Sequence, residues 1–195
     1  LPWVAAPSEG EAQAAAMLEA GVVDAAVSQD FDTLLFGASR LLRNLTVSGR
    51  RKLPGRQEWV DVTPEELTLA GALEATQLTR EQLVDMAILM GTDFNPGIHG
   101  IGPKKGLKLL RELGSAEAAL EKLGHEIDNL DELRQLFLEH PSVEFEPTWG
   151  ESRRGRVMEL LCDRHGFSRS RVSGALEKFA QPAPPTGQQA TLGDF

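Results

Sequence analysis

Residues 22–37 read VVDAAVSQDFDTLLFG, and the fold class can be inferred from them. Its first part, residues 22–28, is a short apolar run of the kind that forms a buried strand. Two carboxylates, Asp30 and Asp32, follow this run directly. In sheets whose strands alternate with helices, ligand sites form beyond the strand ends. We therefore predict an acidic site at the end of this strand.

Two further segments place carboxylates against apolar sequence. Glu9 and Glu11 lie in APSEGEA, just before a helical stretch, and Asp93 follows the apolar run ILMGT. Together with Asp30 and Asp32 they would repel one another against a core unless cations neutralised them. Carboxylate oxygens suit Mg²⁺, with Mn²⁺ as a substitute, and two-metal carboxylate sites hydrolyse phosphodiesters. The five residues thus predict a site for two Mg²⁺ ions.

Each acidic cluster also has a simpler interpretation. Ser8 and Glu11 have the spacing of a capping box, which alone would explain Glu11. Asp30 and Asp32 fit a turn after a strand, and Asp93 fits a loop. For any one cluster the simpler interpretation is preferable, but the three together favour the metal site.

Composition narrows the class of protein. The 195 residues suffice for one domain with a sizeable core and a tail. Cys162 is the only cysteine, which excludes a disulfide framework and a cysteine-based metal site. The chain shows neither a run of membrane-spanning length nor a signal peptide, so we expect a cytoplasmic protein without a membrane partner. Because the first residue is Leu1, we also expect a fragment or a processed product.

The net charge of −9 argues against nucleic-acid binding by the chain as a whole. The distribution of charge matters more than its sum. Basic residues gather in three short stretches: Arg50, Arg51, Lys52 and Arg56; Lys104, Lys105, Lys108 and Arg111; and Arg153, Arg154 and Arg156.

The pattern along the chain predicts an α/β fold with a central, mostly parallel sheet flanked by helices, followed by a helical region. Expected strands cover residues 2–5, 22–28, 40–47 and 58–62, the last at the sheet edge, with a basic turn over 48–56. Expected helices cover residues 8–20, 79–91, 103–113, 115–123, 128–140, 152–165 and 168–180. One more helix should open at a capping box formed by residues 63–66.

The segment GIHGIGPKK, residues 97–105, predicts an anion site. Its glycines let the backbone approach a ligand closely, and Pro103 fits the first turn of a helix. That helix start presents unpaired N–H groups. Lys104 and Lys105 lie where the helix dipole disfavours cations, so a phosphate partner explains them better than a plain turn between helices.

Five segments together resemble the flap endonucleases, the XPG/FEN family of structure-specific 5′ nucleases, and its archaeal members in particular: APSEGEAQAA, QDFDTLLFG, ILMGTDF, GIHGIGPKKGLKLL and QATLGDF. The resemblance implies a PIN-like 5′ nuclease fold. It implies that catalytic metals are held by Glu9, Glu11, Asp30, Asp32 and Asp93. It also implies a helix–two-turn–helix element that binds duplex DNA, with a monovalent cation, through Gly100, Gly102, Lys104 and Lys105.

The end of the chain resembles a sliding-clamp (PCNA) binding motif, formed by Gln189, Leu192 and Phe195 after a Pro-rich linker. The simpler interpretation is a disordered terminus. We predict three regions: a metal-binding α/β core portion over residues 1–95, a helical DNA-binding region over 96–180 and a flexible clamp-binding tail over 181–195.

The chain departs from the family pattern in three respects. The family's N-terminal portion, with further metal-binding aspartates and a helical arch, is missing from the sequence. Thr92 and Phe94 stand where members commonly have Ser and Tyr, and the clamp motif ends on one aromatic residue instead of two.

We therefore predict the C-terminal portion of a Mg²⁺-dependent flap endonuclease, with a fold that is incomplete and a chain that is inactive alone. Its partners would be DNA with a 5′ flap, the sliding clamp and the missing N-terminal portion, in replication and repair at the archaeal nucleoid. The alternative is a non-catalytic module that binds DNA and the clamp. A metal-dependent ribonuclease of related topology would explain the carboxylates but neither the glycine-rich segment nor the tail.

Overall fold

The computed structural model describes residues 2–45, 49–52, 55, 57–151 and 153–179. One compact unit spans Trp3–Pro147, and a second is made chiefly by the chain from Thr148 onward. The acidic residues and the glycine-rich segment all belong to the first unit. The clamp motif predicted at Gln189, Leu192 and Phe195 lies outside the described residues.

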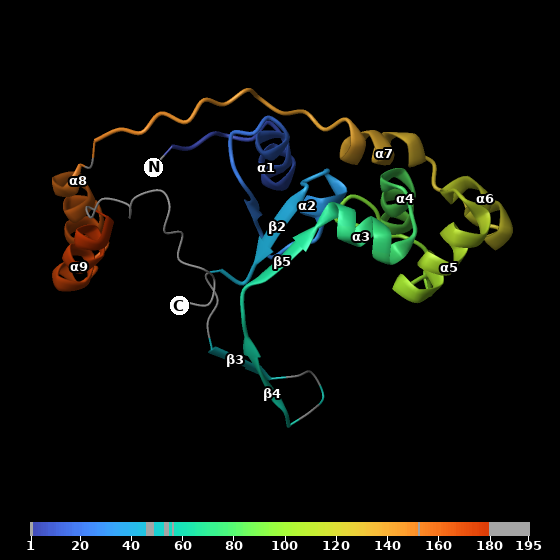
Figure 1. Cartoon of the computed structure of the whole chain (residues 1–195), viewed down its shortest axis with the longest axis horizontal. Helices are drawn as coiled ribbons and strands as arrows, with labels where there is room; N and C mark the ends of the chain where they lie inside the picture. The colour runs from blue at the N-terminus through green and yellow to red at the C-terminus, as the bar shows by residue number, and fades with distance from the viewer. Residues whose placement is uncertain (1, 46–48, 53–54, 56, 152, 180–195) are drawn as a thin grey trace. The chain divides into compact units, whose positions relative to one another are not determined.

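The first unit contains a three-stranded sheet in the order β1-β2-β5 (Figure 1). Its strands are β1 (Ala26–Val27), β2 (Arg40–Arg43) and β5 (Glu65–Thr68). Strand β1 pairs with β2 in parallel, and β2 pairs with β5 in antiparallel fashion. The α/β prediction is confirmed, and within the described chain the sheet has one pairing of each kind. The strands are shorter than predicted, and residues 2–5 form no strand.

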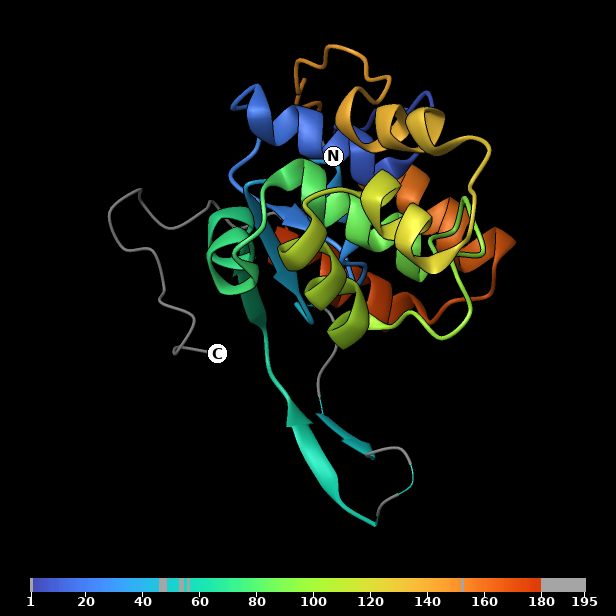
Figure 2. The same cartoon turned by 90° about the vertical axis from the view of Figure 1, so that its right-hand side faces the viewer.

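Two sequence predictions near the sheet are wrong. Residues 48–56 were predicted as a basic turn, but β3 (Gly49–Lys52) pairs with β4 (Trp59–Val62) in a separate hairpin, visible beyond the sheet in Figures 1 and 2. The capping box predicted at residues 63–66 is absent, because Glu65 and Glu66 enter β5. There they pair with Arg43 and Arg40 across the ladder. Tertiary pairing thus overrides a local helix signal.

Three helices flank the sheet: α1 (Gly10–Glu19), α2 (Asp32–Leu35) and α3 (Leu69–Thr76). Helix α1 begins after Glu9, not at Ser8, and no side chain caps its first turn. The capping box predicted from Ser8 and Glu11 is therefore wrong, which leaves Glu11 without a capping role. Helix α3 instead begins after Thr68, whose side chain accepts the Gly71 N–H.

Four helices complete the unit: α4 (Arg80–Met90), α5 (Pro103–Leu113), α6 (Ala116–Leu123) and α7 (Leu130–Leu138). The predicted boundaries of α4, α5 and α6 agree with the structure, and α4 has the reciprocal capping box of Thr79 and Gln82. These helices share one apolar core with α1, in which Ile88, Leu110 and Phe137 are fully buried.

A buried ion pair ties α4 to α7. Arg134 donates two hydrogen bonds to Asp85, at 2.6 and 2.9 Å, and Asp85 also accepts the Ala116 N–H at the start of α6 at 2.8 Å. Arg134 also contacts Glu117, and its guanidinium lowers the pKa of Glu117 to about 2. This network links α4, α6 and α7 to one another.

The second unit contains α8 (Arg154–Met158), the π-helix η1 (Glu159–Arg164) and α9 (Arg169–Phe179). The single helix predicted over residues 152–165 is therefore divided, because its second half takes π-helical hydrogen bonding. Arg154 of α8 pairs with Glu177 of α9 at 3.3 Å. None of the helices in the described ranges is long and apolar enough to cross a membrane.

Candidate metal centre

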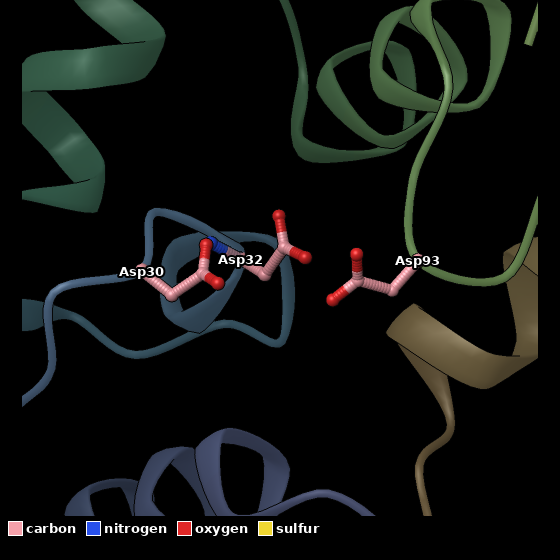
Figure 3. A group of neighbouring side chains, drawn as sticks. All are labelled: Asp30, Asp32 and Asp93. Atoms are coloured by element: carbon pink, nitrogen blue, oxygen red, sulfur yellow. The ribbon is translucent and has the colours of Figure 1, made fainter.

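Three of the predicted metal ligands converge. Asp30 lies in the loop after β1, Asp32 is the first residue of α2, and Asp93 lies in the loop after α4. One carboxylate oxygen from each lies within 4.8 Å of the others. Figure 3 shows the three side chains pointing toward a common centre. Residues that are far apart in sequence thus form one acidic cluster.

The loop that carries Asp30 and Asp32 is ordered by its own hydrogen bonds. The Asp30 N–H donates to Ser28 Oγ at 3.1 Å, and the Asp32 N–H donates to Asp30 Oδ1 at 3.3 Å. The fully buried Thr33 donates its hydroxyl to the Asp30 carbonyl at 3.1 Å. Short polar side chains favour such turns because they can bond to nearby backbone groups. The backbone of this loop and one carboxylate oxygen of Asp30 are therefore fixed by the chain itself.

The loop that carries Asp93 depends on two glycines. Gly91 ends α4 with a φ of +103°, and Gly97 has a φ of +66°. A Cβ on Gly97 would lie 2.3 Å from the Gly91 nitrogen, so only glycine permits this approach. Within the loop, the Thr92 hydroxyl donates to Asn95 Oδ1 at 2.8 Å, and Asn95 donates to the Ile88 carbonyl at 2.8 Å. These contacts fix the conformation of the loop that carries Asp93 after the end of α4.

The other two predicted ligands stand beside this cluster. Glu11 lies in the first turn of α1 and accepts a hydrogen bond from Ser28 Oγ at 3.1 Å. Glu9 occupies the position just before α1. Neither belongs to the group of three converging carboxylates, although both are close enough to act electrostatically on Asp32. Sequence reasoning missed Ser28, for which the available signal was a hydroxyl residue two positions before the first aspartate.

The cluster is short of positive charge. Burial, followed by repulsion from its neighbours, raises the pKa of Asp32 from 3.8 to about 6; these neighbours are, in order of effect, Asp30, Asp93, Glu11 and Glu9. In the part of the chain that the structure describes, no Lys or Arg forms an ion pair with the three aspartates. Oxygen ligands without a protein counter-charge suit a divalent cation, so the residues present fit Mg²⁺ or Mn²⁺.

The glycine-rich segment joins α4 to α5. Ile98 and Ile101 are buried and anchor it, whereas Lys104 and Lys105 are exposed in the first turn of α5. Gly100 has a φ of +80°, and neither it nor Gly102, the residue before α5, has a neighbour within 4 Å of an added Cβ; both therefore border open space. The structure thus gathers the predicted DNA-contacting residues at the start of one helix. Their role in binding DNA stays a prediction.

Comparison with known proteins shows what this chain is similar to. Residues 1–93 match the family model described as the XPG I-region. Flap endonuclease 1 of Methanocella arvoryzae is 44% identical over 198 residues, covering 100% of this chain and 58% of that protein. Flap endonuclease 1 of Caldivirga maquilingensis is 48% identical over 202 residues, covering 100% of this chain and 57% of that protein. The chain therefore spans 57–58% of the length of these curated relatives.

Solved structures of similar proteins point to the same relatives as the sequence comparison. Flap endonuclease-1 from Methanococcus jannaschii superposes with a TM-score of 0.77 at 37% identity, over 91% of this chain and 52% of that one. The catalytic core of Rad2 in complex with a DNA substrate gives a TM-score of 0.69 over 91% of this chain and 64% of that one. At 19% identity this second likeness shows the fold alone.

Proposed function

We propose that the chain belongs to the flap endonuclease family, and that it supplies carboxylates and a duplex-binding element to a nuclease that hydrolyses DNA phosphodiesters at 5′ flaps. The observation that supports the proposal is the convergence of Asp30, Asp32 and Asp93 from two separate loops. Because the chain spans 57–58% of its curated relatives, the complete activity belongs to this proposal. Replication and repair of DNA at the archaeal nucleoid would be its setting.

The carboxylates would hold two Mg²⁺ ions, with Mn²⁺ as a substitute. Asp30, Asp32 and Asp93 would provide direct oxygen ligands, while Glu9 and Glu11 would act through bound water. When bound, two such ions activate the attacking water and stabilise the leaving oxygen of the phosphodiester. The chain contributes the hydrogen-bonded loop that carries Asp30 and Asp32, and the partial burial of Asp32, which strengthens its electrostatic interactions.

The start of α5 would bind the phosphates of the DNA duplex. Its first-turn N–H groups and the exposed Lys104 and Lys105 offer hydrogen bonds and positive charge in one place. Gly100 and Gly102 leave room for a strand to approach the backbone, and a monovalent cation would assist there. The similarity to flap endonuclease 1 at 44% identity favours a DNA partner for this chain too.

A second candidate function is a non-catalytic module that binds DNA and the sliding clamp. It rests on the spacing of Gln189, Leu192 and Phe195, which lie outside the described residues. This module would need the rest of the family's length for turnover. Both candidates predict DNA binding, and they differ in whether the carboxylates of this chain take part in cleavage once the remaining length is supplied.

A flap-cleavage assay tests the proposal. With a labelled 5′-flap substrate and Mg²⁺, we expect duplex binding but no cleavage by residues 1–195 alone. Cleavage should appear when the unmatched portion of the Methanocella arvoryzae relative is added or fused. Asp30→Asn should then abolish cleavage and spare DNA binding, whereas Asp128→Asn, an exposed carboxylate on another loop, should change neither. Cleavage that survives Asp30→Asn would refute the assigned site.

A further inference from the structure

Ser28 links the two elements that carry the acidic residues. Its backbone N–H donates to the Leu42 carbonyl at 3.3 Å, which fixes the residue to the sheet beside β2. Its hydroxyl donates to Glu11 Oε1 on α1 and accepts the Asp30 N–H, each at 3.1 Å. The half-buried Ser28 thus joins Glu11 on a helix to Asp30 in a loop, two residues that are 19 positions apart in the sequence.

The Ser28 hydroxyl is the donor in one of these hydrogen bonds and the acceptor in the other. A serine hydroxyl has one proton to donate and two lone pairs to accept with. Donation to Glu11 engages only one of that carboxylate's oxygens, so Oε2 is left for another ligand. Acceptance from Asp30 fixes the backbone at the residue whose carboxylate enters the acidic cluster.

Two of the three hydrogen bonds that order the loop do not involve Ser28. The bonds from Asp32 to Asp30 and from Thr33 to the Asp30 carbonyl lie within the loop and would survive loss of the hydroxyl. The contact with Glu11, by contrast, is made by Ser28 alone among the hydrogen bonds of the described side chains. Removing the hydroxyl would therefore break the hydrogen-bonded link between Glu11 and Asp30 and leave each element folded.

We propose that Ser28 is a positioning residue for the divalent-metal site, acting through Glu11 and Asp30 without touching the ion. It sets the distance between the carboxylate of α1 and the aspartate cluster before the ion arrives. This inference rests on the proposed metal site. A pre-set carboxylate does not have to be ordered on binding, and this lowers the cost of capturing the ion.

Calorimetric titration of residues 1–195 with Mn²⁺ tests the inference. We expect Ser28→Ala to raise the dissociation constant on the order of tenfold, as the loss of one hydrogen bond to a charged group would. Ser28→Thr keeps the hydroxyl and should stay within about twofold of the natural chain. The control is Ser39→Ala, an exposed serine outside the cluster, which should bind Mn²⁺ unchanged.

Hydrogen exchange of the Asp30 amide provides a readout that needs no metal. In Ser28→Ala the Asp30 amide should exchange faster than in the natural chain, while the amides of α4 should keep their protection. Unchanged Mn²⁺ affinity in Ser28→Ala, or equal weakening in Ser28→Ala and Ser28→Thr, would overturn the inference. If the natural chain binds no Mn²⁺, the proposed metal site itself fails. If Asp30→Asn abolishes binding while Ser28→Ala does not, only the role of Ser28 fails.

Discussion

Replacing Asp32 with asparagine should stabilise the metal-free protein, and the gain should grow with pH. The pKa of Asp32 is raised to about 6 in the folded chain, against 3.8 when it is fully exposed to water. Between these values the folded state retains a proton that the unfolded state has lost. Stability therefore falls as pH rises from about 4 to about 6, because charging this carboxylate beside its neighbours is unfavourable.

The magnitude follows from the shift. A difference of about two pKa units corresponds to about 3 kcal/mol when each unit is worth about 1.4 kcal/mol. Asp32 is only half-buried, so solvent screening reduces this to about 1–2 kcal/mol. Asp32→Asn also removes a negative charge from the start of α2, which costs a few tenths of a kcal/mol at pH values where the carboxyl is ionised. The variant should match the natural chain near pH 4 and exceed it by about 1 kcal/mol at pH 7.

Denaturant unfolding in the presence of a chelator measures this difference. Both proteins are unfolded at several pH values between 4 and 7.5, with Asp128→Asn as the exposed control. Excess Mn²⁺ should then reverse the ranking at pH 7, because an ion that binds only the folded state stabilises the natural chain. A stability difference that does not change with pH, or one that falls as pH rises, would refute the electrostatic account of the cluster.

Three other changes test other parts of the molecule. Lys104→Ala combined with Lys105→Ala should lower the salt dependence of duplex binding by about two units of slope, and an unchanged slope in a fluorescence titration would favour a plain turn. Arg134→Met should lower the free energy of unfolding by about 3–5 kcal/mol in denaturant, because it leaves the buried Asp85 unpaired. Phe195→Ala should weaken clamp binding about tenfold to a hundredfold by calorimetry, without a change in melting temperature.

Local signals in the sequence predicted the helical part of the fold well. The Thr79 capping box, Pro103 after Gly102, and the glycines at 114 and 124 mark helix ends where the structure has them. These signals act within a few residues, so no knowledge of the remaining chain is needed. The same reasoning failed at Glu65 and Glu66, whose fate depends on pairing with β2.

The site was predicted in part for the same reason. The positions of Asp30, Asp32 and Asp93 after apolar runs indicated their convergence, because strand and helix ends meet at one edge of a sheet. Ser28 could not be assigned, since its role depends on how α1 is rotated against the loop. Ala12 and Ala15 pack α1 into the core, a tertiary contact that the local pattern does not encode.

The net charge of −9 does not conflict with a DNA partner once its distribution is known. Residues 153–178 carry seven basic side chains and three acidic ones. Each of these acids is paired with an arginine, at 2.5–3.3 Å. This leaves four cations of the described segment without an ion pair: Arg153, Arg156, Arg171 and Lys178. Since phosphate binding depends on local cations that release counterions, total charge is a poor guide to it, and the salt slope is the measurement that decides.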